Sequence, residues 1–214
     1  MNILKEALEI ISVHKAQIKE CTEFLFVNPE TGWEEFKSVA VLTALLKNYG
    51  FNIESLVAGL PTAFKATSGK GGSQFCFIAE YDALPELGHA CGHPLIAASA
   101  LAAGIALKEL LKNHSLQGTV IVMGTPGEED KAGKVIMTER GAFNGIDAAL
   151  ISHPMDKSST DSGCLSLSRY QVDFYGRSSH AALNPEDGIN ALDAMLMLFS
   201  AIGMWRQQDR KSVV

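Results

Sequence analysis

Cysteine is scarce in this sequence of 214 residues, and its four cysteines show no paired spacing. Such usage does not indicate a disulfide framework, so each cysteine is expected to fill the core or to bind a ligand. Positive charge is also scarce, with 18 Lys and Arg against 24 Asp and Glu and a net charge of -6. No basic stripe alternates with aromatic residues, which argues against nucleic acid as a partner.

The sequence also has no apolar run of the length that crosses a membrane. The longest mainly apolar run, Leu95 to Leu107, is shorter than the ~20 residues that a membrane-spanning helix needs. Near the N-terminus, Glu6 and Glu9 lie inside an apolar pattern, which a secretory signal would not tolerate. We therefore expect a cytoplasmic location, no membrane partner and a core helix at 95–107.

The apolar residues that are present, 47% of the chain, are enough for a sizeable core and follow the periods of helices and strands. Helices are predicted within 4–18, 36–46, 94–113 and 132–140, and β-prone runs at 51–57, 62–67, 74–80, 119–125 and 148–153. From 74 onward, strands alternate with helices. This order predicts an α/β fold with a mostly parallel sheet that carries helices on both faces.

The pattern changes after Gly163, where "LSLSRYQVDFYG" (165–176) alternates apolar and polar residues as a half-exposed strand does. A helix is predicted over 188–205. One strand and one helix cannot bury their apolar faces alone. We therefore predict the N-terminal part of a catalytic domain at 1–163 and the incomplete start of an α+β domain at 164–214.

Three common functional motifs can be set aside. "SGKGGS" (68–73) has Gly71 where a phosphate loop needs Ser or Thr, and a strand follows it. The sequence contains neither a serine-hydrolase G-x-S-x-G motif nor a dinucleotide-binding G-x-G-x-x-G motif.

Polar residues instead gather after the predicted parallel strands, at the sheet edge where α/β proteins bind their ligands. These residues are Asp82, Cys91, His93, Glu128, Glu129 and His153. A thiolate, two imidazoles and several carboxylates suit zinc, manganese or cobalt.

Local context suggests how these groups could divide the chemistry. Cys91 lies close to the start of the helix at Pro94, where the helix dipole would favour the thiolate. Glu128 and Glu129 should diverge if their loop is extended, so that one binds metal and the other serves as a general base in metal-assisted hydrolysis.

Simpler interpretations exist for each residue on its own. Cys91 could be a buried small hydrophobe, His93 a helix cap and His153 a satisfied core histidine, while Glu128 to Asp130 could form a solvated acidic turn. Their joint placement at successive strand ends favours a shared metal site.

Four segments in order, "AEYDALPELGHACGH", "GTPGEED", "GAFNGIDAALISHP" and "FYGRSSHAALNPEDGINALDA", resemble the aminoacylase and carboxypeptidase family of dinuclear metallo-amidohydrolases. The resemblance covers roughly residues 76 to 194. It is strongest to the branch with aminobenzoyl-glutamate hydrolase subunits and β-alanyl-lysine type dipeptidases, whose hallmark is "GHACGHNLIA". Pro94 replaces the Asn of that hallmark.

The resemblance implies a zinc-exopeptidase-like catalytic domain with two divalent ions, zinc or else manganese or cobalt. The implied ligands are Cys91, His93, Glu129 and His153. Glu128 would be the general base, Asp82 an orienting carboxylate, and His180 a residue of the dimerisation (lid) domain that stabilises the oxyanion in the partner subunit. Elsewhere in the family a metal-binding His occupies the position of Glu80, and the Cys-x-His pair is expected to replace it.

Members of this family continue for well over a hundred further residues, with another metal-binding His, so we expect an N-terminal fragment of a homodimeric enzyme. The implied substrate is a small molecule, an N-acyl amino acid, an aminobenzoyl-glutamate or a dipeptide. Two alternatives remain open at this point: a truncated, non-catalytic fragment with weak or no metal binding, and a cysteine amidase that uses Cys91 as nucleophile.

Overall fold

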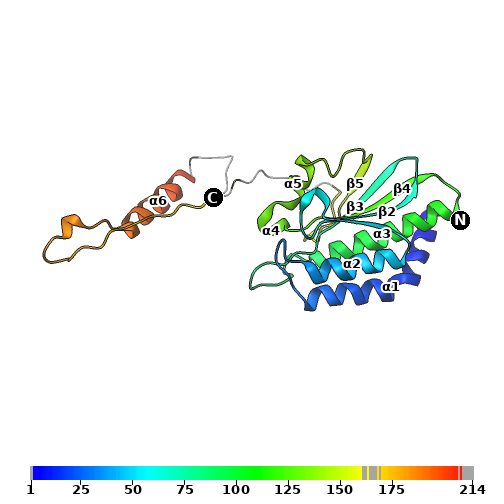
Figure 1. Cartoon of the computed structure of the whole chain (residues 1–214), viewed down its shortest axis with the longest axis horizontal. Coiled ribbons are helices and arrows are strands. Elements are labelled where there is room, and N and C mark those ends of the chain that lie inside the picture. The colour runs from blue at the N-terminus through cyan, green and yellow to red at the C-terminus, as the bar shows by residue number, and fades with distance from the viewer. Residues whose placement is uncertain (1, 161–162, 164–167, 169, 207, 209–214) are drawn as a thin grey trace. The chain divides into compact units, whose positions relative to one another are not determined.

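The computed structural model describes residues 2–160, 163, 168, 170–206 and 208, and its contacts divide the chain into two units, Met1–Ser158 and Ser159–Val214. Unit 1 contains a five-stranded sheet with helices on both sides (Figure 1). Its elements are α1 (Ile3–Val27), α2 (Phe36–Asn48), β1 (Asn52–Ser55), the 3-10 turn η1 (Val57–Gly59), β2 (Phe64–Lys70), β3 (Gln74–Ala79), α3 (His93–Asn113), β4 (Gly118–Gly124), α4 (Glu128–Lys131), α5 (Gly133–Glu139) and β5 (Ala148–Leu150).

The strand order is β1-β2-β4-β3-β5. β3 pairs in parallel with β4 and β5, whereas β2 pairs antiparallel with β1 and β4. Only β2 therefore runs against the other strands, and the prediction of a mostly parallel α/β sheet is confirmed.

The short connection from β2 to β3 does not form a hairpin, because β4 lies between these two strands. The connection passes the start of β4, where Thr119 N–H donates to the Ser73 carbonyl oxygen at 2.9 Å. Gly72 adopts φ +62°, and a Cβ there would lie 2.6 Å from the Gln117 carbonyl oxygen. A glycine is required at this crossing by both the backbone angle and the lack of space.

Each face of the sheet buries its own apolar cluster. α1, α2 and α3 cover one face, where Leu42, Phe64 and Leu101 are buried, and α5 with η1 covers the other, where Met123 and Met137 are buried. Figure 1 shows the three long helices on one side of the sheet and α4 and α5 on the other. The expectation of helices on both faces is confirmed.

Helix α3 is long and apolar enough, by length and composition alone, to cross a membrane. Half of its most apolar window is nevertheless buried, in contacts with α1, β3 and β4. Packing on both sides accounts for its composition, as predicted for a core helix.

Unit 2 contains the 3-10 turn η2 (Pro185–Asp187) and α6 (Ala191–Arg206), the latter confirming the helix predicted over 188–205. Cys164 and part of the predicted strand 165–176 lie outside the described residues. From 170 to 176 the described backbone forms no strand, and a single bridge joins Arg177 to Ile189. An isolated segment cannot hold strand geometry without a hydrogen-bonded neighbour. The assignment of 164–214 to a dimerisation domain stays a prediction.

The end of β4 supplies a test of the packing that leads to the site. Gly124 lies opposite Phe64 in the β2–β4 ladder, and a Cβ on Gly124 would overlap the fully buried Phe64 ring. We expect Gly124→Ala to lower the free energy of unfolding by about 1–3 kcal/mol, because the ring has no space to move into. Denaturant unfolding measures this, with Gly203→Ala, where a Cβ meets nothing within 4 Å, as the control. An unchanged midpoint for Gly124→Ala would contradict this packing.

Candidate metal centre

Asp82, in the loop after β3, connects three elements of unit 1. Its Oδ1 accepts a hydrogen bond from His93 Nδ1 at 3.0 Å, and its own carbonyl oxygen lies 2.8 Å from the same nitrogen. Its Oδ2 accepts the backbone N–H of Glu129 at 3.0 Å. Burial by itself would raise the pKa of Asp82, but these hydrogen bonds outweigh it and the pKa is lowered. Asp82 thus stays ionised and fixes both the imidazole and the start of α4.

His93 is the first residue of α3, and it is 1% exposed. Both partners of Nδ1 are acceptors, so Nδ1 carries the hydrogen and Nε2 is left as a potential ligand atom. Nε2 has no hydrogen-bond partner and lies 3.5 Å from Glu80 Oε2 and 3.6 Å from Glu129 Oε1. The alternative of a simple helix cap is wrong, since the N-cap residue is Gly92.

Two groups of potential metal ligands share His93. Cys91, His93 and Glu129 form one, and Glu80, His93 and His153 form the other, with the ligand atoms of each group within 4.8 Å of one another. A buried nitrogen without a partner, surrounded by thiol, imidazole and carboxylate groups, fits a borderline divalent cation.

His153 reaches the cluster from the end of β5. Its ring centroid lies 6.1 Å from that of His93, and its Nδ1 lies 2.8 Å from the Pro154 carbonyl oxygen. That carbonyl can only accept, so Nδ1 again carries the hydrogen and Nε2 is available. His153 is exposed, so it is not a core histidine.

Glu128 and Glu129 are the first residues of helix α4 and not part of an extended loop. They still diverge, because neighbouring helical residues point about 100° apart. Glu129 is 15% exposed and belongs to a ligand group, whereas Glu128 is 40% exposed, lies outside both groups and has Lys134 Nζ 3.9 Å away. The chain therefore brings Asp82, Cys91, His93, Glu129 and His153 together, with Glu128 beside them.

Cys91 does not have the ionisation expected from the helix dipole. Its hydrogen bond to Glu129, its partial burial and the nearby charges of Glu129, Glu128 and Asp82 raise the pKa of its thiol to about 11. The expectation of a thiolate favoured by the α3 N-terminus is wrong for the metal-free chain, because full carboxylate charges outweigh the partial charge of a helix end.

Two buried carboxylates of the site were not assigned from the sequence. Glu80, 2% exposed, accepts a hydrogen bond from Lys134 Nζ through Oε1, while its Oε2 faces His93. Its place two residues before Asp82 was a signal, because other members of the resembling family have a metal-binding His there.

Glu35 is the second of them, and it is fully buried. It accepts hydrogen bonds from Gly127 N–H at 2.8 Å and Thr62 Oγ1 at 2.5 Å. Burial raises the pKa of Glu35 despite these bonds. Its contact with Gly127 holds the residue directly before Glu128, and no local motif could have revealed this long-range bond.

His180 belongs to unit 2, where its Nδ1 accepts the backbone N–H of Ala182 at 3.2 Å. It is exposed in a loop before α6. Its predicted role in the partner subunit stays a prediction.

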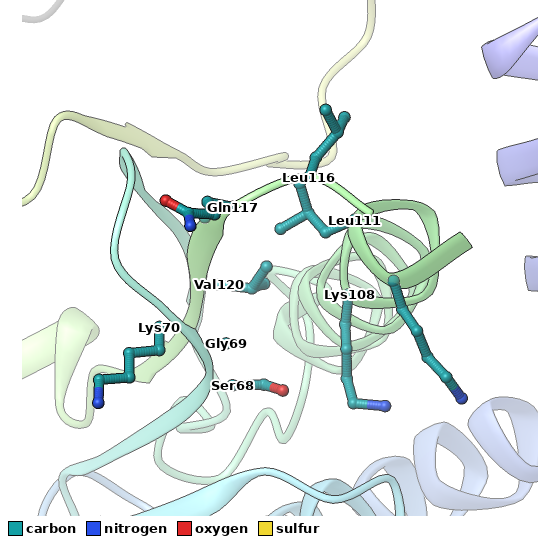
Figure 2. Close-up of a pocket in the computed structure, with 10 residues that line it drawn as sticks. Ser68, Gly69, Lys70, Lys108, Leu111, Leu116, Gln117 and Val120 are labelled. Carbon is teal, nitrogen blue, oxygen red and sulfur yellow. The ribbon is translucent and has the colours of Figure 1, made fainter. Parts of the chain in front are cut away.

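A hollow of about 300 Å³ lies at the other edge of the sheet, between the end of β2, the start of β4 and the end of α3. Figure 2 shows the side chains of Lys70 and Lys108 on opposite sides of it. Because the ligand groups follow the carboxyl ends of β3, β4 and β5, this hollow is separate from the candidate metal centre.

The raised pKa of Cys91 can be tested without metal or substrate. With chelator present at pH 8, about one Cys91 thiol in a thousand should be ionised, so alkylation by iodoacetamide should be slow. Glu129→Gln should speed alkylation of Cys91 by about tenfold, since it removes the main cause of the raised pKa. Peptide mass spectrometry measures the rate at this residue, with Asp130→Asn in the same helix as the control. Equal rates for wild type and Glu129→Gln would refute the cause assigned here.

The chain is similar in sequence to known hydrolases. The chain is 35% identical to Xaa-Arg dipeptidase of Mus musculus over 95% of this chain and 50% of the relative. It is 34% identical to one of the subunits of p-aminobenzoyl-glutamate hydrolase from Escherichia coli, over 89% and 43% of the two chains. The chain spans about half the length of the curated relatives it matches.

Among solved structures, a dinuclear metal binding peptidase of the M20 family from Bacillus subtilis superposes with a TM-score of 0.55 at 26% identity, over 63% of this chain and 42% of that one. Residues 76–200, more than half of the chain, match the family described as peptidase family M20/M25/M40. The segment matched includes every residue of the two potential ligand groups, and the chain is a member of peptidase family M20/M25/M40.

Proposed function

We propose that this chain carries the metal-binding half of a hydrolase that cleaves an amide bond next to a free carboxylate. The observation that supports it most strongly is the buried Nε2 of His93, which has no hydrogen-bond partner and belongs to the residue shared by two groups of potential metal ligands. An apolar or fully paired site would have no need of an ion at this point.

The substrate class follows from what the relatives share. Their names specify Xaa-Arg dipeptides in mouse, p-aminobenzoyl-glutamate in Escherichia coli and N-acetyl-L-cysteine in Bacillus subtilis. In each of these compounds an amide joins an acyl group to an amino acid with a free carboxylate. We infer a substrate of this class, an N-acyl amino acid, an aminobenzoyl-glutamate or a dipeptide.

Cys91, His93, Glu129 and His153 would hold two divalent ions, zinc or else manganese or cobalt. When bound, such ions supply Lewis acidity toward the substrate carbonyl and the attacking water. Asp82 keeps the His93 ring and the α4 backbone in place, through contacts of 3.0 Å to each. The chain's part in binding is thus to present its ligands already oriented.

Glu128 would accept a proton from the attacking water and return it to the departing amine. It lies beside the cluster and belongs to neither ligand group, and unlike the buried Asp82 it is partly exposed, which leaves room for a substrate. His180 would donate a hydrogen bond to the oxyanion that forms at the carbonyl carbon, from the second subunit of a homodimer.

The alternative function, a cysteine amidase with Cys91 as its nucleophile, has less support. A thiol whose pKa is raised to about 11 and which donates to Glu129 is a poor nucleophile at neutral pH. His93, one of the two histidines two residues away from Cys91, is committed to Asp82 through Nδ1. The remaining alternative is a fragment without catalytic activity. Metal counting and an amidase assay on this chain distinguish it from the proposed hydrolase.

Substitution of the two neighbouring glutamates tests the proposed division of roles. In the full-length protein, Glu128→Gln should lower turnover by at least about a hundredfold and leave metal content unchanged, because a general base typically contributes that much or more. Glu129→Gln should lower both, because it removes a ligand. Metal analysis and hydrolysis of acylated amino acids and dipeptides measure the two effects. Loss of metal from Glu128→Gln, with metal retained by Glu129→Gln, would reverse the assignment.

Mixing of variants tests the role of His180. His180→Ala in the full-length protein should lower turnover about a hundredfold to a thousandfold, as loss of an oxyanion donor does. If His180 serves the partner subunit, mixing the Glu128→Gln and His180→Ala proteins should restore activity, since a heterodimer contains one intact site. Confirmed subunit exchange without recovered activity would exclude a role in the partner subunit.

A further inference from the structure

The pair formed by Glu80 and Lys134 lies beside the metal ligands without an assigned role. Glu80 follows β3 and is 2% exposed, while Lys134 lies in the first turn of α5 with 31% of its side chain exposed. Lys134 Nζ donates to Glu80 Oε1 and also lies 3.9 Å from Glu128 Oε1. One ammonium group therefore contacts both a buried carboxylate and the proposed general base.

The two oxygens of Glu80 have different surroundings. Oε1 has the lysine, but Oε2 is buried with no hydrogen-bond partner and lies 3.5 Å from His93 Nε2, which has none either. With the His93 hydrogen on Nδ1, two lone-pair-bearing atoms face each other in a buried space. Such an arrangement is unfavourable alone and becomes favourable with a proton on Nε2, which the raised pKa of His93 favours, or with a metal cation between the two atoms.

The backbone fixes the position from which Lys134 reaches Glu80. Gly133 N–H donates to the Gly127 carbonyl oxygen at 3.2 Å, and a Cβ on Gly133 would overlap the Pro126 carbonyl oxygen. The start of α5 is therefore packed directly against the loop that leads to Glu128. This packing fixes the backbone at Lys134, and the hydrogen bond to Glu80 holds its side chain at the site.

We propose that Lys134 is a positioning residue of the metal centre. Its ammonium group holds one oxygen of Glu80, so that the other oxygen is directed at a divalent cation shared by Glu80, His93 and His153. This inference rests on the metal-dependent function proposed above and adds a ligand, Glu80, and its support, Lys134.

A lysine that competes with the metal for Glu80 and a lysine that orients Glu80 would have opposite effects on metal affinity. If the ammonium competes with the metal for Glu80, its removal should strengthen metal binding. If it orients Glu80, its removal should weaken binding about tenfold to a hundredfold, as loss of a hydrogen-bond partner behind a ligand does. Metal affinity therefore decides between the two without any assay of turnover.

The experiment is a Co²⁺ titration of the complete chain, with affinity measured by competition with a chromophoric chelator. Lys134→Met should weaken Co²⁺ binding about tenfold to a hundredfold, and Lys134→Arg should restore most of it. Lys131→Met is the matched control, because Lys131 contacts Asp130 and the Trp33 ring and has a similar exposure of 39%. It should bind Co²⁺ as the wild type does.

A double-mutant cycle with Glu80→Gln separates the contact from a general charge effect. Glu80→Gln alone should weaken binding, and Lys134→Met should add little to it, since the lysine acts through Glu80. Circular dichroism of the metal-free proteins checks that each is folded. If Lys134→Met does not fold, the Co²⁺ affinities of Lys134→Gln and Glu80→Gln are compared with that of the wild type instead.

The wild-type titration separates the two proposals. A thiolate-to-cobalt absorption band that disappears in Cys91→Ser supports the metal site itself. If that band is present but Lys134→Met binds Co²⁺ as tightly as the wild type or more tightly, the role of Lys134 is refuted and the proposed function stands. If the wild type binds no Co²⁺, both are refuted.

Discussion

The carboxylate of Asp82 is the constraint on which the candidate site depends. One oxygen holds the first residue of α3 through His93, and the other holds the backbone of α4 through Glu129. A single buried side chain thereby joins the end of β3 to two helix starts. Without it, His93 Nε2 and the Glu129 carboxylate would not be held 3.6 Å apart, and the ligand groups would have no common centre.

The charges around this centre favour a bound cation. Four carboxylates, from Glu80, Asp82, Glu128 and Glu129, lie around or beside His93. Lys134 contacts two of them, Glu80 and Glu128. Buried like charges repel strongly and are stable only when paired or bound to metal. The helix packing of unit 1 supports this arrangement, because Glu35 fixes Gly127 and the start of α5 carries Lys134.

The sequence predicted the parts of the site that follow from local order. Asp82, Cys91, His93, Glu129 and His153 follow strands or begin helices, and the carboxyl ends of parallel strands meet at one edge. The reversal of β2 and the bonds of Glu35 and Lys134 depend on contacts between segments distant along the chain, which no local pattern encodes.

The ionisation of Cys91 shows another limit of local reasoning. The helix start was visible in the sequence and favours a thiolate, but the hydrogen bond to Glu129 appears only in the folded chain and raises the pKa instead. The strand predicted over 165–176 failed in its described part for a related reason, since alternation predicts a half-buried surface only where a neighbouring strand is available.

Crystals of this chain grown with zinc would test the central claim most directly, through anomalous diffraction collected on both sides of the zinc absorption edge. We predict an anomalous peak within bonding distance of His93 Nε2, with Glu80 or Glu129 as a further ligand and Asp82 still on Nδ1. Zinc bound only at exposed surface side chains, with the His93 Nε2 atom left without metal at saturating zinc, would contradict the account.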